Sequence, residues 1–179
     1  MTDIRAILLT HSHADHAGSA AQLKSDSGAE LYCSVADTPA VQGAEKAPHP
    51  PFLDKTPLQI LKPLLDLLPG AEPAAVDHQI QAGATQTLPE DLVAFASPGH
   101  TPGHTSYRLE RAGGILFVGD AALHKGGTVN RGWFNRSKRD IDQSARDLAK
   151  LDFEVACFGH ADPITSGASA AFKAYAATL

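Results

Sequence analysis

The strongest constraint on this sequence is a repeated pattern in which a short apolar segment ends on a potential metal ligand. The apolar run "IRAILLT" (4–10) leads directly into "HSHADH" (11–16), which holds three histidines and one aspartate within six positions. Three later segments end in the same way, "FASPGH" at His100, "ILFVGD" at Asp120 and "CFGH" at His160. Imidazole and carboxylate groups are ligands of first-row metals. The pattern therefore favours a metal site built from loops that follow buried strands.

The spacing within "HSHADH" indicates more than one ion. Four ligand groups so close in sequence do not all fit one tetrahedral ion, whereas a loop can turn His11 and His13 toward one point and Asp15 and His16 toward a neighbouring point. Each ion then needs further ligands from elsewhere, and a glycine directly precedes each of the three later candidates. Glycine lets the backbone turn sharply and brings a ligand close. The sequence predicts two ions.

Four pieces of the chain occur in the order of the motifs of the metallo-β-lactamase-fold hydrolase superfamily: "THSHADH", "SPGHTPGHT", "FVGDA" and "FGHADPI". The chain resembles that family from Ile4 onward. The resemblance implies an α/β fold, a four-layer αββα sandwich with a dinuclear metal site at one edge, here as a single domain over 1–179. By this resemblance His11, His13 and His100 hold the first metal. Asp15, His16 and His160 hold the second metal, and Asp120 bridges the two.

The same resemblance implies a reaction. Two divalent ions share a bridging hydroxide, which attacks a carbonyl carbon, and Asp15 and Asp120 are the catalytic residues. Asp15 is expected to touch the hydroxide and to pass its proton to the leaving group. Zinc is the default metal for such a site, and iron and manganese are compatible with the same ligand types.

Asp120 points to a substrate class. An aspartate at this position resembles the glyoxalase II, lactonase and phosphodiesterase branches of the superfamily, whereas true β-lactamases generally have cysteine or serine there. The local "PGHTPGHTSY" is most similar to glyoxalase II and lactonase-like members. A carbonyl ester, a thioester or a lactone is therefore the expected small-molecule substrate.

Two alternatives remain open from the sequence. An iron-dependent persulfide (sulfur) dioxygenase would use the same three histidines, or a subset of them, with an aspartate. A truncated metal-binding scaffold without catalysis would keep the ligands and lose the pocket.

Composition excludes several other classes. The formal net charge is −5 and the basic residues are scattered, which argues against a nucleic-acid surface. No apolar run has the length of a membrane span, and the first ten residues lack the regions of a signal peptide, so a cytoplasmic protein is expected. The two cysteines, Cys33 and Cys157, do not form a disulfide framework.

The remaining pattern is mixed α/β. Strands are predicted at 4–10, 30–35, 75–80, 92–97, 105–110, 115–118 and 154–159, with the first two parallel, and helices at 17–28, 57–70, 138–152 and 166–179. The leucine-rich helix at 57–70 could form a lid over the site or an interface.

Some residues near the motifs are candidates for the substrate pocket. Trp133 and Phe134 lie in a glycine-flanked loop and could form a pocket wall, and His124 follows Asp120 by four residues. His104 is expected to bond within its turn or to support a ligand. His49 and His78 are read as ordinary surface histidines, and Tyr107 as a core residue.

The motif lies unusually early in the chain. Superfamily members carry several strands before it, so the domain is expected to be amino-terminally shortened, with 4–10 and 31–35 at risk of forming a bare sheet edge. Three explanations would account for the early position of the motif. The sequence is a fragment or has a misassigned start, it is a minimal version whose sheet is covered by the helix at 57–68, or it forms an oligomer. A homodimer with an apolar interface is the favoured expectation.

Overall fold

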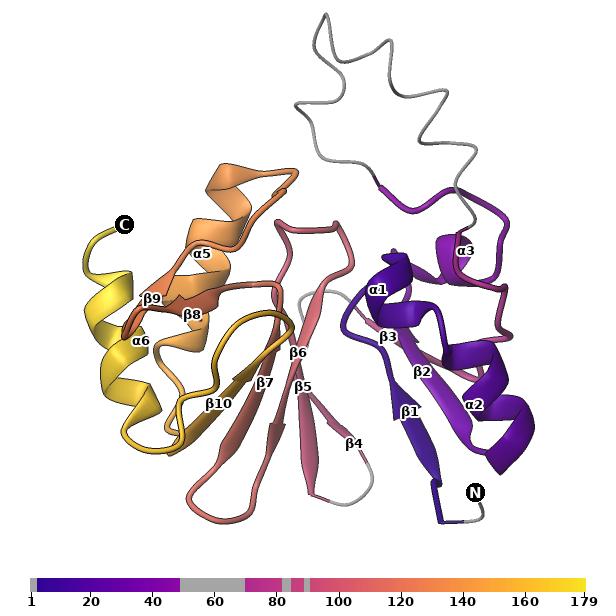
Figure 1. The fold of residues 1–179 in the computed structure, drawn as a ribbon, viewed down its shortest axis with the longest axis horizontal. Coiled ribbons are helices and arrows are strands. Elements are labelled where there is room, and N and C mark those ends of the chain that lie inside the picture. Colours follow the sequence, from indigo (N-terminus) through magenta and orange to yellow (C-terminus); the bar gives the residue numbers. More distant parts are fainter. Residues whose placement is uncertain (1–2, 49–69, 82–84, 89–90) are drawn as a thin grey trace, which may run out of the picture.

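The protein is described by a computed structural model that covers residues 3–48, 70–81, 85–88 and 91–179. Two sheets face each other, and helices cover the outer side of each (Figure 1). This arrangement confirms the predicted α/β sandwich of four layers. The predicted helix at 57–70 and His49 lie outside the described residues.

The first sheet is parallel and has the order β1-β2-β3, formed by β1 (Ala6–Leu8), β2 (Glu30–Ser34) and β3 (His78–Ile80). The expected parallel pairing of the first two strands is confirmed. The expectation that 31–35 borders a bare edge is wrong, because β3 pairs with β2 on the side away from β1, with Tyr32 opposite His78. In the described part of the chain β1 forms an edge of this sheet.

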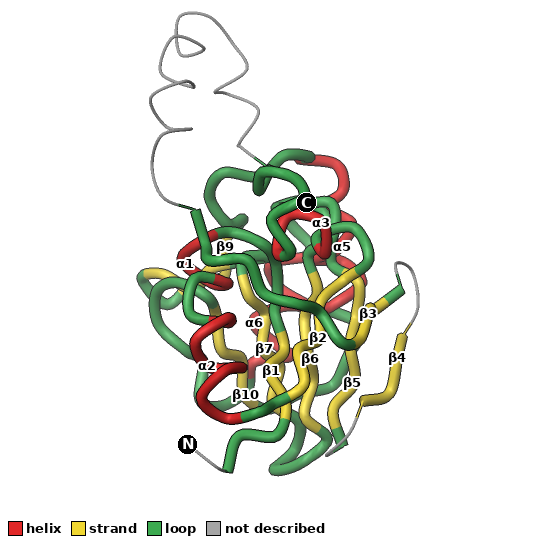
Figure 2. Tube along the Cα trace, turned by 90° about the vertical axis from the view of Figure 1, so that its right-hand side faces the viewer, coloured by secondary structure: helices red, strands yellow, loops and turns green. Residues whose placement is uncertain are grey.

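In the described part of the chain, three helices belong to the first sheet, α1 (Ala14–Ala17), α2 (Ala20–Ser27) and α3 (Thr38–Val41). Figures 1 and 2 show α2 on the outer side of β1 and β2. It ends as predicted at Gly28, which has the left-handed conformation with a φ of 71°. Small and aliphatic side chains fill the interface between helix and sheet, among them Leu9, Ala20, Leu31 and Cys33.

The second sheet has the order β10-β7-β6-β5-β4 and is antiparallel except for the β7–β10 pair. Its strands are β4 (Thr85–Leu88), β5 (Leu92–Ala96), β6 (Thr105–Leu109), β7 (Ile115–Gly119) and β10 (Val155–Phe158). The helices α5 (Lys138–Leu148) and α6 (Ala168–Ala176) cover its outer face (Figure 1).

The α5 helix follows from its sequence. Ser137 caps its start by accepting a hydrogen bond from the Asp140 N–H. Ile141, Ala145 and Leu148 recur at helical spacing and are buried against the sheet.

The space between the two sheets holds a separate apolar cluster of Tyr32, Ile80, Leu88, Ala94 and Tyr107. Tyr107 is buried as expected, and its hydroxyl donates a 2.6 Å hydrogen bond to the carbonyl of Leu9. This bond ties β6 to the end of β1 and so joins the two sheets close to the loops that carry the candidate metal ligands.

Sequence patterns missed β4 and a hairpin of β8 (Leu123–Lys125) and β9 (Thr128–Asn130). The hairpin has a readable signal, because Gly126 and Gly127 both take positive φ angles, 62° and 76°, as tight two-residue hairpin turns favour. Within the described ranges, no helix combines the length and the apolar character needed to cross a bilayer.

Candidate metal centre

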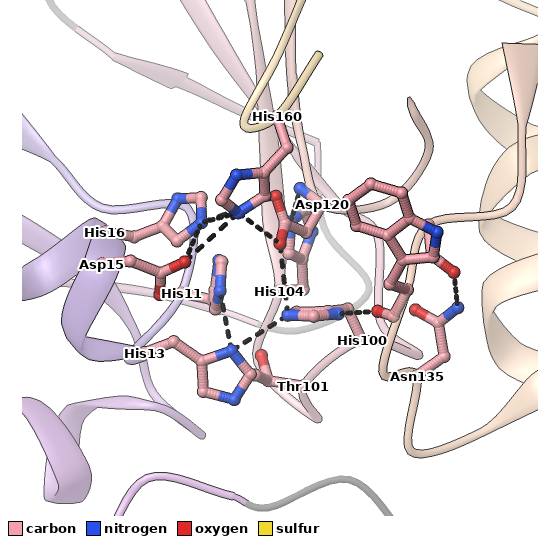
Figure 3. Close-up of polar contacts among 12 residues, drawn as sticks. His11, His13, Asp15, His16, His100, Thr101, His104, Asp120, Asn135 and His160 are labelled. Carbon is pink, nitrogen blue, oxygen red and sulfur yellow. Dashed lines mark hydrogen bonds and ion pairs between the residues drawn. The ribbon is translucent and has the colours of Figure 1, made fainter. Parts of the chain in front are cut away.

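The seven side chains singled out from the motifs meet at one edge of the sandwich (Figure 3). The segment after β1 supplies four of them, His11 and His13 from the loop and Asp15 and His16 from α1. The turn between β5 and β6 supplies His100. Asp120 and His160 follow β7 and β10, which run parallel and therefore end at the same edge. The two sheets thus bring together candidate ligands that lie far apart in the sequence.

The first group consists of three histidine nitrogens. His13 Nδ1 lies 3.0 Å from His11 Nε2 and 2.9 Å from His100 Nε2. The outward nitrogens face backbone carbonyls, since His13 Nε2 donates to Pro48 O at 2.8 Å and His100 Nδ1 donates to Trp133 O at 3.1 Å. A carbonyl oxygen only accepts, so these contacts set the tautomers of His13 and His100.

These tautomers leave the inward-facing nitrogens of the two rings without a proton. In the neutral rings His13 Nδ1 and His100 Nε2 carry lone pairs that face each other at 2.9 Å. Burial lowers the pKa of His11 and His100, so these rings favour the neutral, ligand form. Two facing lone pairs repel unless a cation lies between them, and the residues present therefore fit a metal ion here.

The second group lies beside the first and consists of Asp15, His16 and His160. His160 Nε2 is 3.2 Å from Asp15 Oδ2 and 3.4 Å from His16 Nε2. Asp15 Oδ2 lies 3.6 Å from His16 Nε2. Part of this group faces solvent, since the Asp15 side chain is 57% exposed.

Asp120 stands between the two groups. Its Oδ2 is 3.5 Å from both His100 Nε2 and His160 Nε2, and its Oδ1 is 3.5 Å from His16 Nε2. Oδ1 is buried and has no hydrogen-bond partner among the described residues. Burial opposes ionisation, but the neighbouring histidines outweigh it and lower the pKa of Asp120. A buried, ionised carboxylate with an oxygen that lacks a hydrogen bond also fits a cation.

His104 supports Asp120 through a buried chain of hydrogen bonds. Its Nε2 accepts from the Asp120 N–H at 2.9 Å, so its Nδ1 carries the proton and donates to Ser97 Oγ at 2.8 Å. Ser97 Oγ lies 2.8 Å from Ser106 Oγ, which donates to the carbonyl of Val118. Burial lowers the pKa of His104 to about 3, which keeps this ring neutral. The expectation that His104 supports a ligand agrees with this contact.

Asp37 is a buried residue that the sequence analysis did not identify. Its carboxylate accepts hydrogen bonds from the Ser12 N–H, the Thr101 hydroxyl and the Gly103 N–H, each at 2.9 Å. It therefore ties the first ligand loop to the loop of His100. The surrounding sequence, "ADTP", indicates only the start of a helix. Nothing in the neighbouring residues therefore predicts that Asp37 joins the two loops.

A cavity of about 740 Å³ opens beside the two groups. Trp133, Phe134, Asp15 and Asp120 are among its lining residues, and contact of the two aromatic side chains with a substrate stays a prediction. The structure does not bring His124 to the described lining. This ring stacks on Phe158 instead, and its Nδ1 donates to the carbonyl of Asp162. His78 lies at the surface beside Glu30.

Two curated bacterial proteins are similar to this chain over most of its length. The chain is 29% identical to a probable metallo-hydrolase, YflN, of Bacillus subtilis, over 90% of this chain and 66% of that protein. It is 28% identical to a hydroxyacylglutathione hydrolase of Cereibacter sphaeroides, over 86% of this chain and 47% of the relative. The chain thus spans at most about two thirds of the length of these curated relatives.

Solved structures agree with the fold. A metallo-β-lactamase variant from Cronobacter sakazakii superposes with a TM-score of 0.63 at 27% identity, over 89% of this chain and 59% of that one. A metallo-β-lactamase family protein from Thermus thermophilus gives a TM-score of 0.65 at 23% identity, over 99% of this chain and 61% of that one. The family model of the metallo-beta-lactamase superfamily matches residues 2–160, and the chain therefore belongs to that superfamily.

Proposed function

We propose that this chain is a dinuclear metal-dependent hydrolase that cleaves a carbonyl ester, a thioester or a lactone. The observation that carries the proposal is the convergence of two ligand groups on either side of Asp120. Two adjacent groups favour two ions over the single iron of a persulfide dioxygenase. The names of the curated relatives, metallo-hydrolase and hydroxyacylglutathione hydrolase, support a hydrolase.

The proposed roles follow from the contacts. His11, His13 and His100 hold one cation, Asp15, His16 and His160 hold the other, and Asp120 serves both. Zinc is the proposed metal because the donors are mainly imidazole nitrogens. When bound, two such cations lower the pKa of a water held between them and polarise the carbonyl group of a substrate.

The chain itself contributes three things to the reaction. The carbonyls of Pro48 and Trp133 orient His13 and His100, and His104 orients Asp120 through its N–H. Asp15 lines the cavity, which supports its proposed role: its carboxylate accepts a proton from an attacking water and returns it to the leaving group. The cavity walls hold the substrate and exclude water around it.

The experiment combines metal analysis with a substrate panel. We expect two zinc ions per chain and turnover of at least one member of a panel of S-lactoylglutathione, aliphatic lactones and aryl esters. Asp120→Ala is expected to lose about one metal equivalent and to reduce kcat/KM by at least about 100-fold. Asp152→Ala is the matched control, because the side chain of this aspartate is 91% exposed and forms an ion pair with the exposed Lys173.

The alternatives give different results. One iron per chain with oxygen uptake on a persulfide would indicate the dioxygenase. Two bound metals without turnover of any substrate would indicate a non-catalytic scaffold. Full activity in Asp120→Ala would contradict the bridging role.

A further inference from the structure

The Asp37 carboxylate holds two loops at once. Asp37 is 1% exposed, and its Oδ2 accepts hydrogen bonds from the Ser12 N–H and the Thr101 hydroxyl, both at 2.9 Å. Its Oδ1 accepts from the Gly103 N–H, also at 2.9 Å. Buried polar groups lose free energy when they are left without a partner, so three donors aimed at one carboxylate restrain the loops that carry them.

The donors lie next to the candidate ligands of the first group. Ser12 separates His11 from His13 in the sequence, and Thr101 directly follows His100. Figure 3 shows these three histidines together with Thr101. The carboxylate therefore holds a residue adjacent to each histidine of the first group.

Another link between the same loops lies outside the ligand segments. The Thr105 N–H donates to the carbonyl of Thr10 at 2.8 Å. Thr10 precedes the histidines of the first loop and Thr105 follows those of the second, so this bond joins the segment after β1 to the start of β6. The bonds of Asp37 lie further in, between the candidate ligands.

Asp37 is itself held in place. Its carbonyl accepts from the N–H groups of Ala40 and Val41, both at 3.1 Å, and its N–H donates to Ser34 Oγ at 3.2 Å. The second loop approaches it so closely that a Cβ added at Gly103 would overlap the Asp37 carboxylate and the Ser34 hydroxyl. A fixed carboxylate can therefore set the positions of both loops.

The metal-free protein needs such a restraint. The inward nitrogens of His13 and His100 lie 2.9 Å apart, and their lone pairs repel when no cation lies between them. The bonds of Asp37 oppose this repulsion, because they tie both loops to one group. Ligands that are already in place lose less conformational entropy when they bind an ion.

The second ligand group depends on other segments. Asp15 and His16 lie in α1, and His160 follows β10. The three hydrogen bonds to the Asp37 side chain come from neither segment. An effect of Asp37 should therefore fall mainly on the first group.

We propose that Asp37 is a positioning residue that holds His11, His13 and His100 at binding distance before a cation arrives. Its loss weakens cation binding at the first group far more than at the second. The inference rests on the proposed function for the identity of the two groups, but it concerns binding and not the reaction.

The test is Asp37→Asn in two backgrounds, each of which keeps one group. His160→Ala keeps the first group and His13→Ala keeps the second. The amide has the shape of the carboxylate but turns one acceptor into a donor, which then faces another donor. In calorimetric zinc titrations we expect Asp37→Asn to weaken binding about 10- to 100-fold in His160→Ala and less than about threefold in His13→Ala.

Thr101→Val is a milder second variant. It removes one of the three donors, keeps the size of the side chain and leaves the carboxylate intact. We expect zinc binding in the His160→Ala background to weaken about 3- to 10-fold, the usual effect of one hydrogen bond. A further readout needs no metal, since Asp37→Asn should speed the amide hydrogen exchange of Ser12 and Gly103 in the metal-free protein.

Ser169→Ala is the matched control for a general loss of stability. Ser169 Oγ accepts from the Phe153 N–H at 2.7 Å and donates to the Phe153 carbonyl at 2.8 Å. Phe153 precedes β10, whereas the candidate ligand of this strand follows it. This variant should lower Tm and leave zinc binding unchanged in both backgrounds.

The outcomes separate the two proposals. Equal weakening in both backgrounds would overturn the positioning role, because a general loss of stability would then explain it. Unchanged zinc affinity of Asp37→Asn in the His160→Ala background would overturn it as well. A His160→Ala protein that binds no zinc would refute both the positioning role and the proposed ligand groups. Selective weakening in a protein that hydrolyses no substrate of the panel would support the positioning role and refute the proposed function.

Discussion

Replacing His104 by leucine tests whether the buried hydrogen-bond chain positions Asp120. Leucine has nearly the volume of histidine but neither accepts from the Asp120 N–H nor donates to Ser97 Oγ. An orphaned buried N–H costs about 1–3 kcal/mol, and the lost bond to the serine about 1 kcal/mol, so the metal-free variant should be about 2–4 kcal/mol less stable. For a chain of this size that corresponds to a fall in Tm of roughly 4–16 °C.

The same substitution should weaken metal binding. The main chain of Asp120 loses its anchor, and loss of a residue that orients a ligand typically reduces metal affinity about 10- to 100-fold. Urea denaturation of the metal-free protein measures the first effect, and calorimetric zinc titration measures the second. His78→Leu is the control, because this surface histidine faces Glu30 and should change stability by less than about 1 kcal/mol.

The result that would refute the reasoning is specific. If His104→Leu unfolds within about 0.5 kcal/mol of the wild type and binds zinc with unchanged affinity, the buried chain neither stabilises the fold nor positions Asp120.

Three further predictions follow from the same site. Gly159→Ala should lower metal affinity at least about 10-fold in calorimetry, because an added Cβ would overlap the Asp120 carboxylate, whereas Gly70→Ala has open space and should bind metal normally. Asp37→Asn should lower the free energy of unfolding by about 2–4 kcal/mol in urea, because an amide cannot accept all three hydrogen bonds; an unchanged midpoint would contradict this. Below pH 6.5 the His104 side chain binds a proton in the unfolded chain but not in the native protein, where its pKa is about 3. From this group alone, the free energy of unfolding of the metal-free protein should fall by about 1.4 kcal/mol for each pH unit between pH 6.5 and pH 3. His104→Leu should show a shallower pH dependence in urea unfolding, and parallel curves would argue against the neutral buried ring.

Much of the fold was predictable because its signals are local. The capped start of α5 and the glycine end of α2 depend on residues within one or two turns of each other. The strands that carry ligands were found because each is an apolar run that stops at a polar residue. The β8–β9 hairpin was missed although its paired glycines are a local signal.

Other features depend on pairing between distant segments. The predicted edge position of 31–35 failed because β3, more than forty residues later, pairs with β2. Asp37 could not be identified because its three donors come from two other loops, whose approach depends on how the sheets pack.

The sequence by itself determined which side chains are candidate metal ligands, that they follow strands, and that "HSHADH" concentrates four of them within six positions. These properties depend on residue types and on short spacings in the sequence, and residues that are close in the sequence are also close in space. Only the tertiary structure decided which nitrogens face each other, that His104 bonds to the main chain of Asp120, and that a cavity opens beside the two groups. Those relations join residues up to nearly ninety positions apart, and the packing of two sheets against each other, rather than any local preference, sets the distances between them.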